Sequence, residues 1–222
     1  MKVDRSGKNF GAPALTYIAE KKMEAKLGRQ LQKETSSRAI SWGKFVQHRV
    51  TNLLLPTSCK PTKDERRVHE TITNWTGAED YIRHGHGEKN ENVSGEVKCF
   101  ELKKFCEAHD AATAGWETLK KECEEIAWQL VSNAILNKTS WAELCLYVPY
   151  KKELDAIREE ASQNETPHEH QWLKYAKDDE LPYLIEGLHY KNLSEFTFAI
   201  PNEDVIALTN NVIKGVAELN KK

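Results

Sequence analysis

The chain has 222 residues, which is enough for one sizeable hydrophobic core, and this length predicts a single domain over residues 1–222. With 39% hydrophobic and 30% charged residues, the sequence is typical of a globular protein and excludes a disordered tail. The formal net charge of −2 excludes a strongly basic nucleic-acid coat, although local lysine clusters can still contact phosphates.

The sequence shows neither a secretory signal nor a membrane span. The start of the chain, MKVDRSGKNFGAPALTY, contains no apolar stretch of signal-peptide length, and no run of about 18 apolar residues follows. The five cysteines include no C-x-x-C pair, which indicates reduced, mostly packed thiols rather than disulfides or a zinc ribbon. We therefore expect a cytoplasmic protein without a membrane partner.

The N-terminal part is predicted to be helical. Residues 14–34 are rich in strong helix formers and follow Pro13, a favourable residue at a helix start. A second helix is predicted over residues 36–55, with Ser36 or Ser37 as its N-cap. Its buried stripe consists of apolar residues at helical spacing, which are Trp42, Val46, Val50 and Leu53.

The core, residues 66–150, combines strands with one long helix. Residues 67–83 and 92–105 alternate in the manner of strands, and the turn-rich segment between them favours pairing of the two. A long helix is predicted over residues 115–136, because apolar residues recur there at helical spacing. Residues 142–150 form a predicted buried strand.

The C-terminal part, residues 151–222, is predicted to contain a helix near 151–162, a strand over 195–200 and a terminal helix from about Asn202. Hairpin strands mixed with helical crossovers predict one sheet with helices packed on it. The predicted class is therefore α/β or α+β. A central mixed β-sheet would be flanked by helices, and residues 14–55 would be the helical N-terminal part of the same domain.

Charged side chains alternate along the stretch SGEVKC. Glu96 and Lys98 point to one face of the predicted strand, and Val97 points to the other face, which can join the core. Asp80 on the neighbouring strand can lie beside Glu96 if the two strands pair. Two carboxylates next to an ammonium group match the oxygen ligands that Mg²⁺ prefers, but such alternation is also common on solvated strand faces.

Four motifs occur in an order that favours a metal site over a solvated strand face. TGAED and GEVKC on successive strands, AWQLV on a helix and LCLYVPY on a strand resemble the PD-(D/E)xK nuclease superfamily, especially the phage-type recombination exonucleases of the lambda-exonuclease and YqaJ-like group. The resemblance covers residues 36–150 and implies a restriction-endonuclease-like core. The Pro-Asp pair of the family is replaced here by Glu79-Asp80, which leaves the aspartate in place.

The same resemblance implies a set of site residues. Asp80 and Glu96 would be the ligands of Mg²⁺ or Mn²⁺, assisted by the Val97 carbonyl. Lys98 would be the catalytic lysine, and Gln129 would be the glutamine of the following helix. At about 100° per residue, Gln129 lies at the rim of the buried face of its helix, from which it can reach an active site.

The segment SWGKFVQHRV resembles the family's first helix, in which a glutamate assists the metal. The matching position is Gln47, whose neutral amide cannot supply that charge, and Gln47 is the candidate site residue of this helix. His48 lies about 100° further round and is predicted to face solvent. The predicted site therefore has two carboxylates rather than three, which implies either weaker metal binding or lost catalysis.

Two functions stay open on the sequence alone. The first is a Mg²⁺-dependent deoxyribonuclease, an exonuclease of phage or prophage recombination type that acts on DNA. The second is a nuclease-fold module, catalytically weak or inactive, that binds nucleic acid or a partner protein. The resemblance is compatible with a homo-oligomer and with a recombination partner protein. Lysines near the proposed site in the sequence are candidates for phosphate contacts, and these are Lys103, Lys104, Lys120, Lys151 and Lys152.

Overall fold

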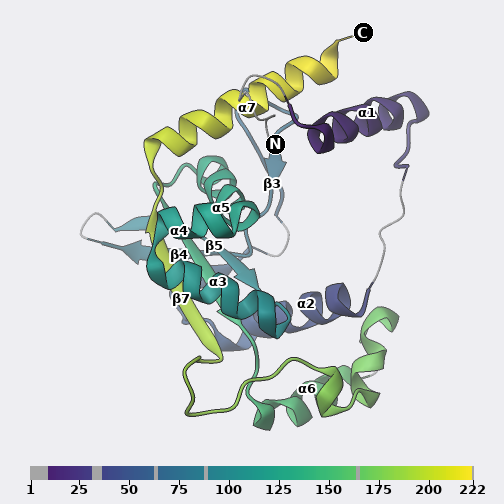
Figure 1. Cartoon of the computed structure of the whole chain (residues 1–222), viewed down its shortest axis with the longest axis vertical. Helices are drawn as coiled ribbons and strands as arrows, with labels where there is room; N and C mark the ends of the chain where they lie inside the picture. Colours follow the sequence, from purple (N-terminus) through teal and green to yellow (C-terminus); the bar gives the residue numbers. More distant parts are fainter. Residues whose placement is uncertain (1–9, 32–36, 63–64, 88–89, 164–165, 222) are drawn as a thin grey trace. The chain divides into compact units, whose positions relative to one another are not determined.

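The computed structural model describes residues 10–31, 37–62, 65–87, 90–163 and 166–221. The chain divides into two compact units, and Figure 1 shows their elements coloured along the sequence. The first unit consists of Met1–Thr35, Val68–Thr76 and Pro201–Lys222, and the second consists of Ser36–Arg67 and Gly77–Ile200. The second unit contains the predicted sheet and every residue of the predicted site.

The first unit is built around two helices. α1 (Ala12–Leu27) begins at Ala12, so Pro13 lies in its first turn, and it ends before Gly28, whose φ of 65° is the left-handed conformation that terminates helices. The helix predicted to reach residue 34 therefore stops early, and residues 32–34 lie outside the described part of the chain. α7 (Asn202–Asn220) begins where predicted and packs against α1.

A five-stranded sheet forms the centre of the second unit. Its strands stand in the order β1 (Cys59–Pro61), β4 (Tyr81–His86), β5 (Glu91–Lys98), β6 (Trp141–Tyr147) and β7 (Leu193–Ala199). Neighbouring strands are antiparallel except for β5 and β6, which are parallel. The predicted central mixed sheet is confirmed. Two further short strands, β2 (Arg67–Val68) and β3 (Thr76–Gly77), form a separate two-stranded sheet.

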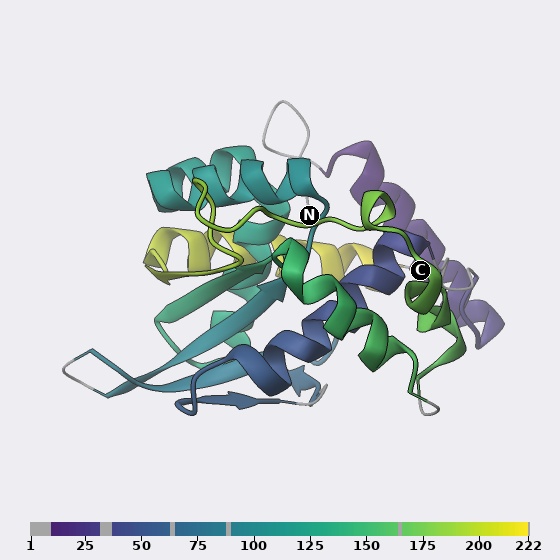
Figure 2. The ribbon, with the colours of Figure 1, turned by 90° about the horizontal axis from the view of Figure 1, so that it is seen from below.

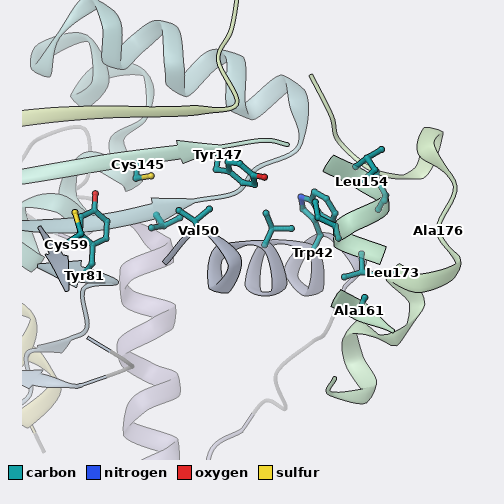
Figure 3. Close-up of a cluster of buried hydrophobic side chains, with 14 residues drawn as sticks. Trp42, Val50, Cys59, Tyr81, Cys145, Tyr147, Leu154, Ala161, Leu173 and Ala176 are labelled. Atoms are coloured by element: carbon teal, nitrogen blue, oxygen red, sulfur yellow. The ribbon is translucent and has the colours of Figure 1, made fainter. Parts of the chain in front are cut away.

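One face of the sheet carries an apolar cluster that includes Val97. Figure 3 labels Tyr81 and Cys145 of the same cluster. Trp42 and Val50 pack onto this face from the helical segment that follows the Ser37 N-cap. Val97 therefore joins the core, as the strand alternation predicts. The helical segments around this cluster are α2 (Arg38–Arg49), the π-helix η1 (Val50–Leu54), α6 (Leu154–Ala161) and the 3₁₀ segment η3 (His168–Tyr175). Two shorter 3₁₀ turns lie next to them in the sequence, η2 (Lys151–Glu153) and η4 (Asp178–Glu180).

The predicted apolar stripe of the second helix is correct up to Val50 and wrong at Leu53. From Val50 onward the helix widens into a π-turn, in which the Leu55 N–H donates to the Val50 carbonyl at 3.1 Å. The wider turn rotates the following side chains off the α-helical spacing. Leu53 is consequently 66% exposed, and Leu54 packs against the cluster in its place.

The opposite face of the sheet carries a second apolar cluster, which includes Leu144 and Leu146 of β6. Three helices cover it, α3 (Leu102–Ala114), α4 (Trp116–Glu122) and α5 (Glu124–Asn137). Figure 2 shows these helices in teal and α2 in blue on opposite sides of the sheet. The second unit is thus a three-layer arrangement, which agrees with the predicted α/β or α+β class.

α3 is a helix that the sequence interpretation missed, as it missed the edge strand β1 and the segment η3. The strand predicted over 92–105 ends at Lys98, and the chain turns helical from Leu102. The alternation seen around Glu101 and Lys103 is coincidental, because the buried residues of this segment follow helical spacing through Phe105 and Ala108 to Ala112.

The single long helix predicted over 115–136 is two helices. The chain breaks at Cys123, where φ is −125° and ψ is 50°, so α4 ends and α5 begins at the next residue. Leu119 of α4 and Ile126 of α5 belong to the same apolar cluster. Their shared burial explains why the apolar spacing continues across a break that no proline or glycine marks.

All five cysteines are free, as predicted, with Cys59 and Cys145 buried. In the described part of the chain, none of the helices is both long enough and apolar enough to cross a bilayer.

Candidate active site

The pairing of β4 with β5 brings the two predicted carboxylates together. Tyr81 pairs with Gly95, so the antiparallel register places Asp80 opposite Glu96. The Asp80 N–H continues this pairing by donating to the Gly95 carbonyl at 3.0 Å. Gly95 must lack a side chain, because a Cβ there would lie 2.2 Å from the Tyr81 ring. The close contact of ring and backbone fixes the register at the site.

Asp80 is held by both of its oxygens. Oδ2 accepts the Val97 backbone N–H at 2.7 Å, and Oδ1 accepts the Gln47 side-chain amide at 2.5 Å. The N–H and C=O of one strand residue point to the same side, so the Val97 carbonyl faces the side of the strand on which Asp80 lies. The structure thus brings Gln47, Asp80 and Val97 together.

Glu96 is 4% exposed and accepts hydrogen bonds at both oxygens. Its Oε1 accepts from the Lys98 ammonium at 2.7 Å and from the Gln129 amide at 2.6 Å. Its Oε2 accepts from the Asn133 amide at 2.9 Å. Lys98 and Gln129 therefore meet at one carboxylate, on the strand face and the helix rim from which the sequence predicts that they act.

The two carboxylates are costly to ionise in the metal-free protein. Burial, and then the negative charge of Glu96, raise the pKa of Asp80 to about 7. Burial also raises the pKa of Glu96, although Lys98 opposes this shift. A cation placed between the carboxylates would relieve both effects, since it favours the ionised forms.

The donor set fits a divalent metal ion with oxygen ligands. Asp80 and Glu96 offer hard carboxylate oxygens, and Mg²⁺ is commonly held by one or two protein carboxylates plus substrate phosphate oxygens. Within the described residues, no group of three or more histidine, cysteine or acidic side chains is arranged to hold a metal. The site thus offers two carboxylates, and Gln47 occupies the place from which a third would reach Asp80.

Asn133 and Asn137 are polar residues of the site region that the sequence interpretation missed. They follow Gln129 at intervals of four residues, so the three amides form one stripe on α5. The Asn137 amide donates to the carboxylate of Glu79 at 2.9 Å. The repeat of three amides at intervals of four residues is the signal that could have identified them.

Glu79 is the second residue whose environment only the structure shows. It is 2% exposed, and its carboxylate pairs with the Arg67 guanidinium at 3.0 Å. Its backbone carbonyl accepts the Thr62 hydroxyl. These contacts fix the residue that precedes Asp80 and so help to hold Asp80 at the end of β4.

Asp80 opens onto a groove of about 830 Å³ in the second unit. Gln47, Thr51 and Asn52 form one wall from α2 and η1, and Pro61 contributes to the lining. Lys44, which the sequence interpretation did not select, also lines the groove. His48 also lines the groove and is exposed, as predicted.

The lysines predicted to contact phosphates are mostly engaged with acidic side chains. Lys103 lies 3.8 Å from Glu107, and Lys120 lies 3.2 Å from Glu117. The ammonium of Lys104 lies over the Phe100 ring. Lys151 and Lys152 pair with Asp178 and Glu186 at 3.4 and 2.5 Å. Contact of these lysines with DNA stays a prediction.

Comparison with known proteins identifies the fold. No protein-family model and no curated protein sequence matches the chain. Among solved structures, a phage-related exonuclease from Haemophilus somnus 129PT is 17% identical with a TM-score of 0.61, over 99% of this chain and 86% of that one. The alkaline exonuclease LHK-Exo from Laribacter hongkongensis is 15% identical with a TM-score of 0.57, over 99% of this chain and 82% of that one. The structure of LHK-Exo in complex with dAMP is 16% identical with a TM-score of 0.58, over 94% of this chain and 80% of that one. The chain therefore has the fold of phage-type exonucleases, and the predicted nuclease core is confirmed.

Gln47 provides a direct test of the predicted metal site. If the chain hydrolyses DNA as predicted, we expect Gln47→Glu to lower the Mg²⁺ concentration that half-saturates this hydrolysis by about tenfold, because ligand charge sets the affinity for such ions. Rates at saturating Mg²⁺ should change little. The measurement is a Mg²⁺ titration at pH 8, above the pKa of Asp80.

Gln47→Met is the matched control, since it keeps the length of the side chain without adding a charge. It should leave the half-saturating concentration unchanged or raise it. A Gln47→Glu protein with an unchanged midpoint would place Gln47 outside the metal shell, despite its contact with Asp80.

Proposed function

We propose that this chain is a metal-dependent deoxyribonuclease that hydrolyses phosphodiester bonds, acting as an exonuclease of phage recombination type. The observation that carries this proposal is the meeting of Asp80, Glu96 and Lys98 at the paired ends of β4 and β5, beside a groove. The fold supports it, because the similar solved structures are exonucleases. The proposal includes DNA as the substrate and Mg²⁺ or Mn²⁺ as the ion.

Each residue of the site has a separate role in the proposed reaction. Asp80 and Glu96 would hold the ion together with the Val97 carbonyl, and Gln129 and Asn133 keep Glu96 in its orientation. When bound, the ion supplies positive charge that stabilises the charge developing on the phosphodiester oxygens. Lys98 orients the attacking water and adds a second positive group at the scissile phosphate. Association with further copies or with a recombination partner protein stays a prediction.

The test is digestion of DNA by the purified protein. Linear duplex should be degraded in the presence of Mg²⁺ and stay intact in EDTA, and covalently closed circular duplex should stay intact under both conditions. Glu96→Gln, purified in parallel, should be inactive, which excludes a contaminating nuclease.

Two results would contradict this proposal. Cleavage of the closed circle would indicate an endonuclease. Binding of linear duplex in a gel-shift assay, without digestion in either Mg²⁺ or Mn²⁺, would instead support a binding module that keeps the nuclease fold.

A further inference from the structure

A second cavity, of about 330 Å³, opens at the β1 edge of the sheet in the second unit. We call it the basic pocket, because Lys60, Arg67 and Lys138 line it. Ile82 and Leu136 contribute apolar lining. Lys60 pairs with Ile82 in the β1–β4 register, so both side chains lie on the same face of the sheet as Glu96.

The charge of the basic pocket favours an anion. Lys60, Arg67 and Lys138 are the cationic lining residues, and Glu65 is the acidic one among the described residues. Arg67 pairs with the buried Glu79 and so stays fixed at the wall, and counting both carboxylates leaves a formal excess of one positive charge. Lys60 is exposed and forms no ion pair with any residue in the described ranges.

The remaining lining of the basic pocket suits the base of a nucleotide, whose phosphate would be the anion. Asn92 and Asn137 present amides, which donate and accept hydrogen bonds as base edges do. His84 lies at 2.8 Å from the Asn92 amide oxygen through its Nδ1 and adds a flat ring to the wall. The cavity volume lies in the range of small-ligand sites, and its lining combines a few apolar side chains with a majority of polar and charged ones.

The basic pocket lies close to the candidate active site. Pro61 lines both this pocket and the groove that contains Asp80. Asn92 and Glu96 lie on the same strand, four residues apart, which corresponds to about 13 Å of extended chain. A DNA strand whose scissile phosphate lies at Asp80 can therefore reach the pocket along Pro61.

We propose that the basic pocket binds a phosphate-bearing nucleotide, with Lys60 and Lys138 on the phosphate and the base against Ile82 and Leu136. The nucleotide would be either part of the DNA strand in the groove or a mononucleotide released from it. This inference rests on the proposed nuclease function for its biological meaning, but binding to the pocket requires no hydrolysis.

The experiment measures binding to the full chain in EDTA, where no cleavage occurs. Two probes separate the two sources of the nucleotide. dTMP is titrated calorimetrically, with thymidine as the control that lacks a phosphate, and 3′-labelled (dT)10 is titrated by fluorescence anisotropy at several salt concentrations. The variants are Lys60→Ala and Lys60→Glu, and the matched control is Lys191→Glu, because Lys191 is exposed and lies outside the pocket.

Loss of one phosphate contact should weaken binding of (dT)10 and lower the slope of log affinity against log salt by about 1 in Lys60→Ala. Lys60→Glu should weaken binding by about tenfold or more, and Lys191→Glu should match the wild type. Weaker binding of dTMP by the Lys60 variants identifies a mononucleotide site. Weaker binding of (dT)10 alone identifies a site for the DNA strand. Both results support the pocket.

Binding of both probes at wild-type strength by Lys60→Glu would overturn the inference. Failure of the proposed function has a different signature, since it appears as absence of Mg²⁺-dependent hydrolysis by the wild-type protein. Failure of the pocket is therefore detected in the binding assay, and failure of the proposed function in the hydrolysis assay.

Discussion

Lys98→Ala is expected to lower the rate of DNA hydrolysis by about 100- to 1000-fold at saturating Mg²⁺, while the affinity for duplex DNA in EDTA stays within about threefold. The ammonium of Lys98 lies 2.7 Å from Glu96, a position from which it can act on the attacking water of the proposed mechanism. A group that acts on the developing charge contributes to the transition state more than to binding of the substrate.

Lys98→Met separates the charge from the aliphatic stem. It keeps most of the packing of the side chain, which is 22% exposed, but cannot stabilise charge, so it should be as inactive as the alanine variant. Lys191→Ala should retain full activity, because Lys191 is exposed and lines neither the groove nor the contacts of Asp80 and Glu96. Turnover above a tenth of the wild-type rate in Lys98→Met would remove the ammonium from the mechanism.

The parts of the site that could be predicted from the sequence are those set by local geometry. Strand alternation places Glu96 and Lys98 on one face, and the hairpin register follows from pairing the two strands around Asp80. Helical angles likewise place Gln129 at the rim of α5 and Gln47 at the edge of α2, and both reach carboxylates there. These relations depend only on the fixed periods of strands and helices.

The parts that could not be predicted depend on contacts between distant segments. Asn137 and Arg67 share the carboxylate of Glu79, and no local pattern in the sequence pairs these three residues. The break at Cys123 is also invisible, because both flanking helices bury apolar residues in one cluster. The missed helix α3 shows the reverse problem, since the short alternation of charged and apolar residues around Glu101 and Lys103 resembles a strand whatever it packs against.

Asp80→Asn should abolish hydrolysis and, at the same time, stabilise the metal-free protein at alkaline pH. The activity should fall by about 1000-fold, because the variant loses one of two carboxylate ligands. Asparagine can still accept the Val97 N–H, and the Gln47 amide can flip to present its oxygen to the new amide group. The hydrogen bonds at position 80 are thereby preserved, and the change isolates the charge.

The sign of the stability change follows from the pKa of Asp80, which is about 7 in the folded protein and about 3.9 in an unfolded chain. Between these values the unfolded chain releases a proton that the folded chain keeps, so this group lowers stability progressively as pH rises from about 4 to about 7, and the loss stays constant at higher pH. Asparagine has no proton to release. At pH 8 the variant should therefore be more stable than the wild type by about 2 kcal/mol, a rise of about 4–8 °C in Tm.

The measurement is thermal unfolding in EDTA at pH 8 and at pH 4, with Asp179→Asn as a control that removes the charge of an exposed aspartate. The difference between Asp80→Asn and the wild type should shrink at pH 4, where Asp80 is protonated in the folded state, and Asp179→Asn should show no comparable gain. Added Mg²⁺ should raise the Tm of the wild type and leave that of Asp80→Asn nearly unchanged, because binding to the folded state alone stabilises it. A variant that is less stable than the wild type at pH 8 in EDTA would show that the hydrogen bonds of the carboxylate outweigh its burial, and that Asp80 is held in place for a structural reason.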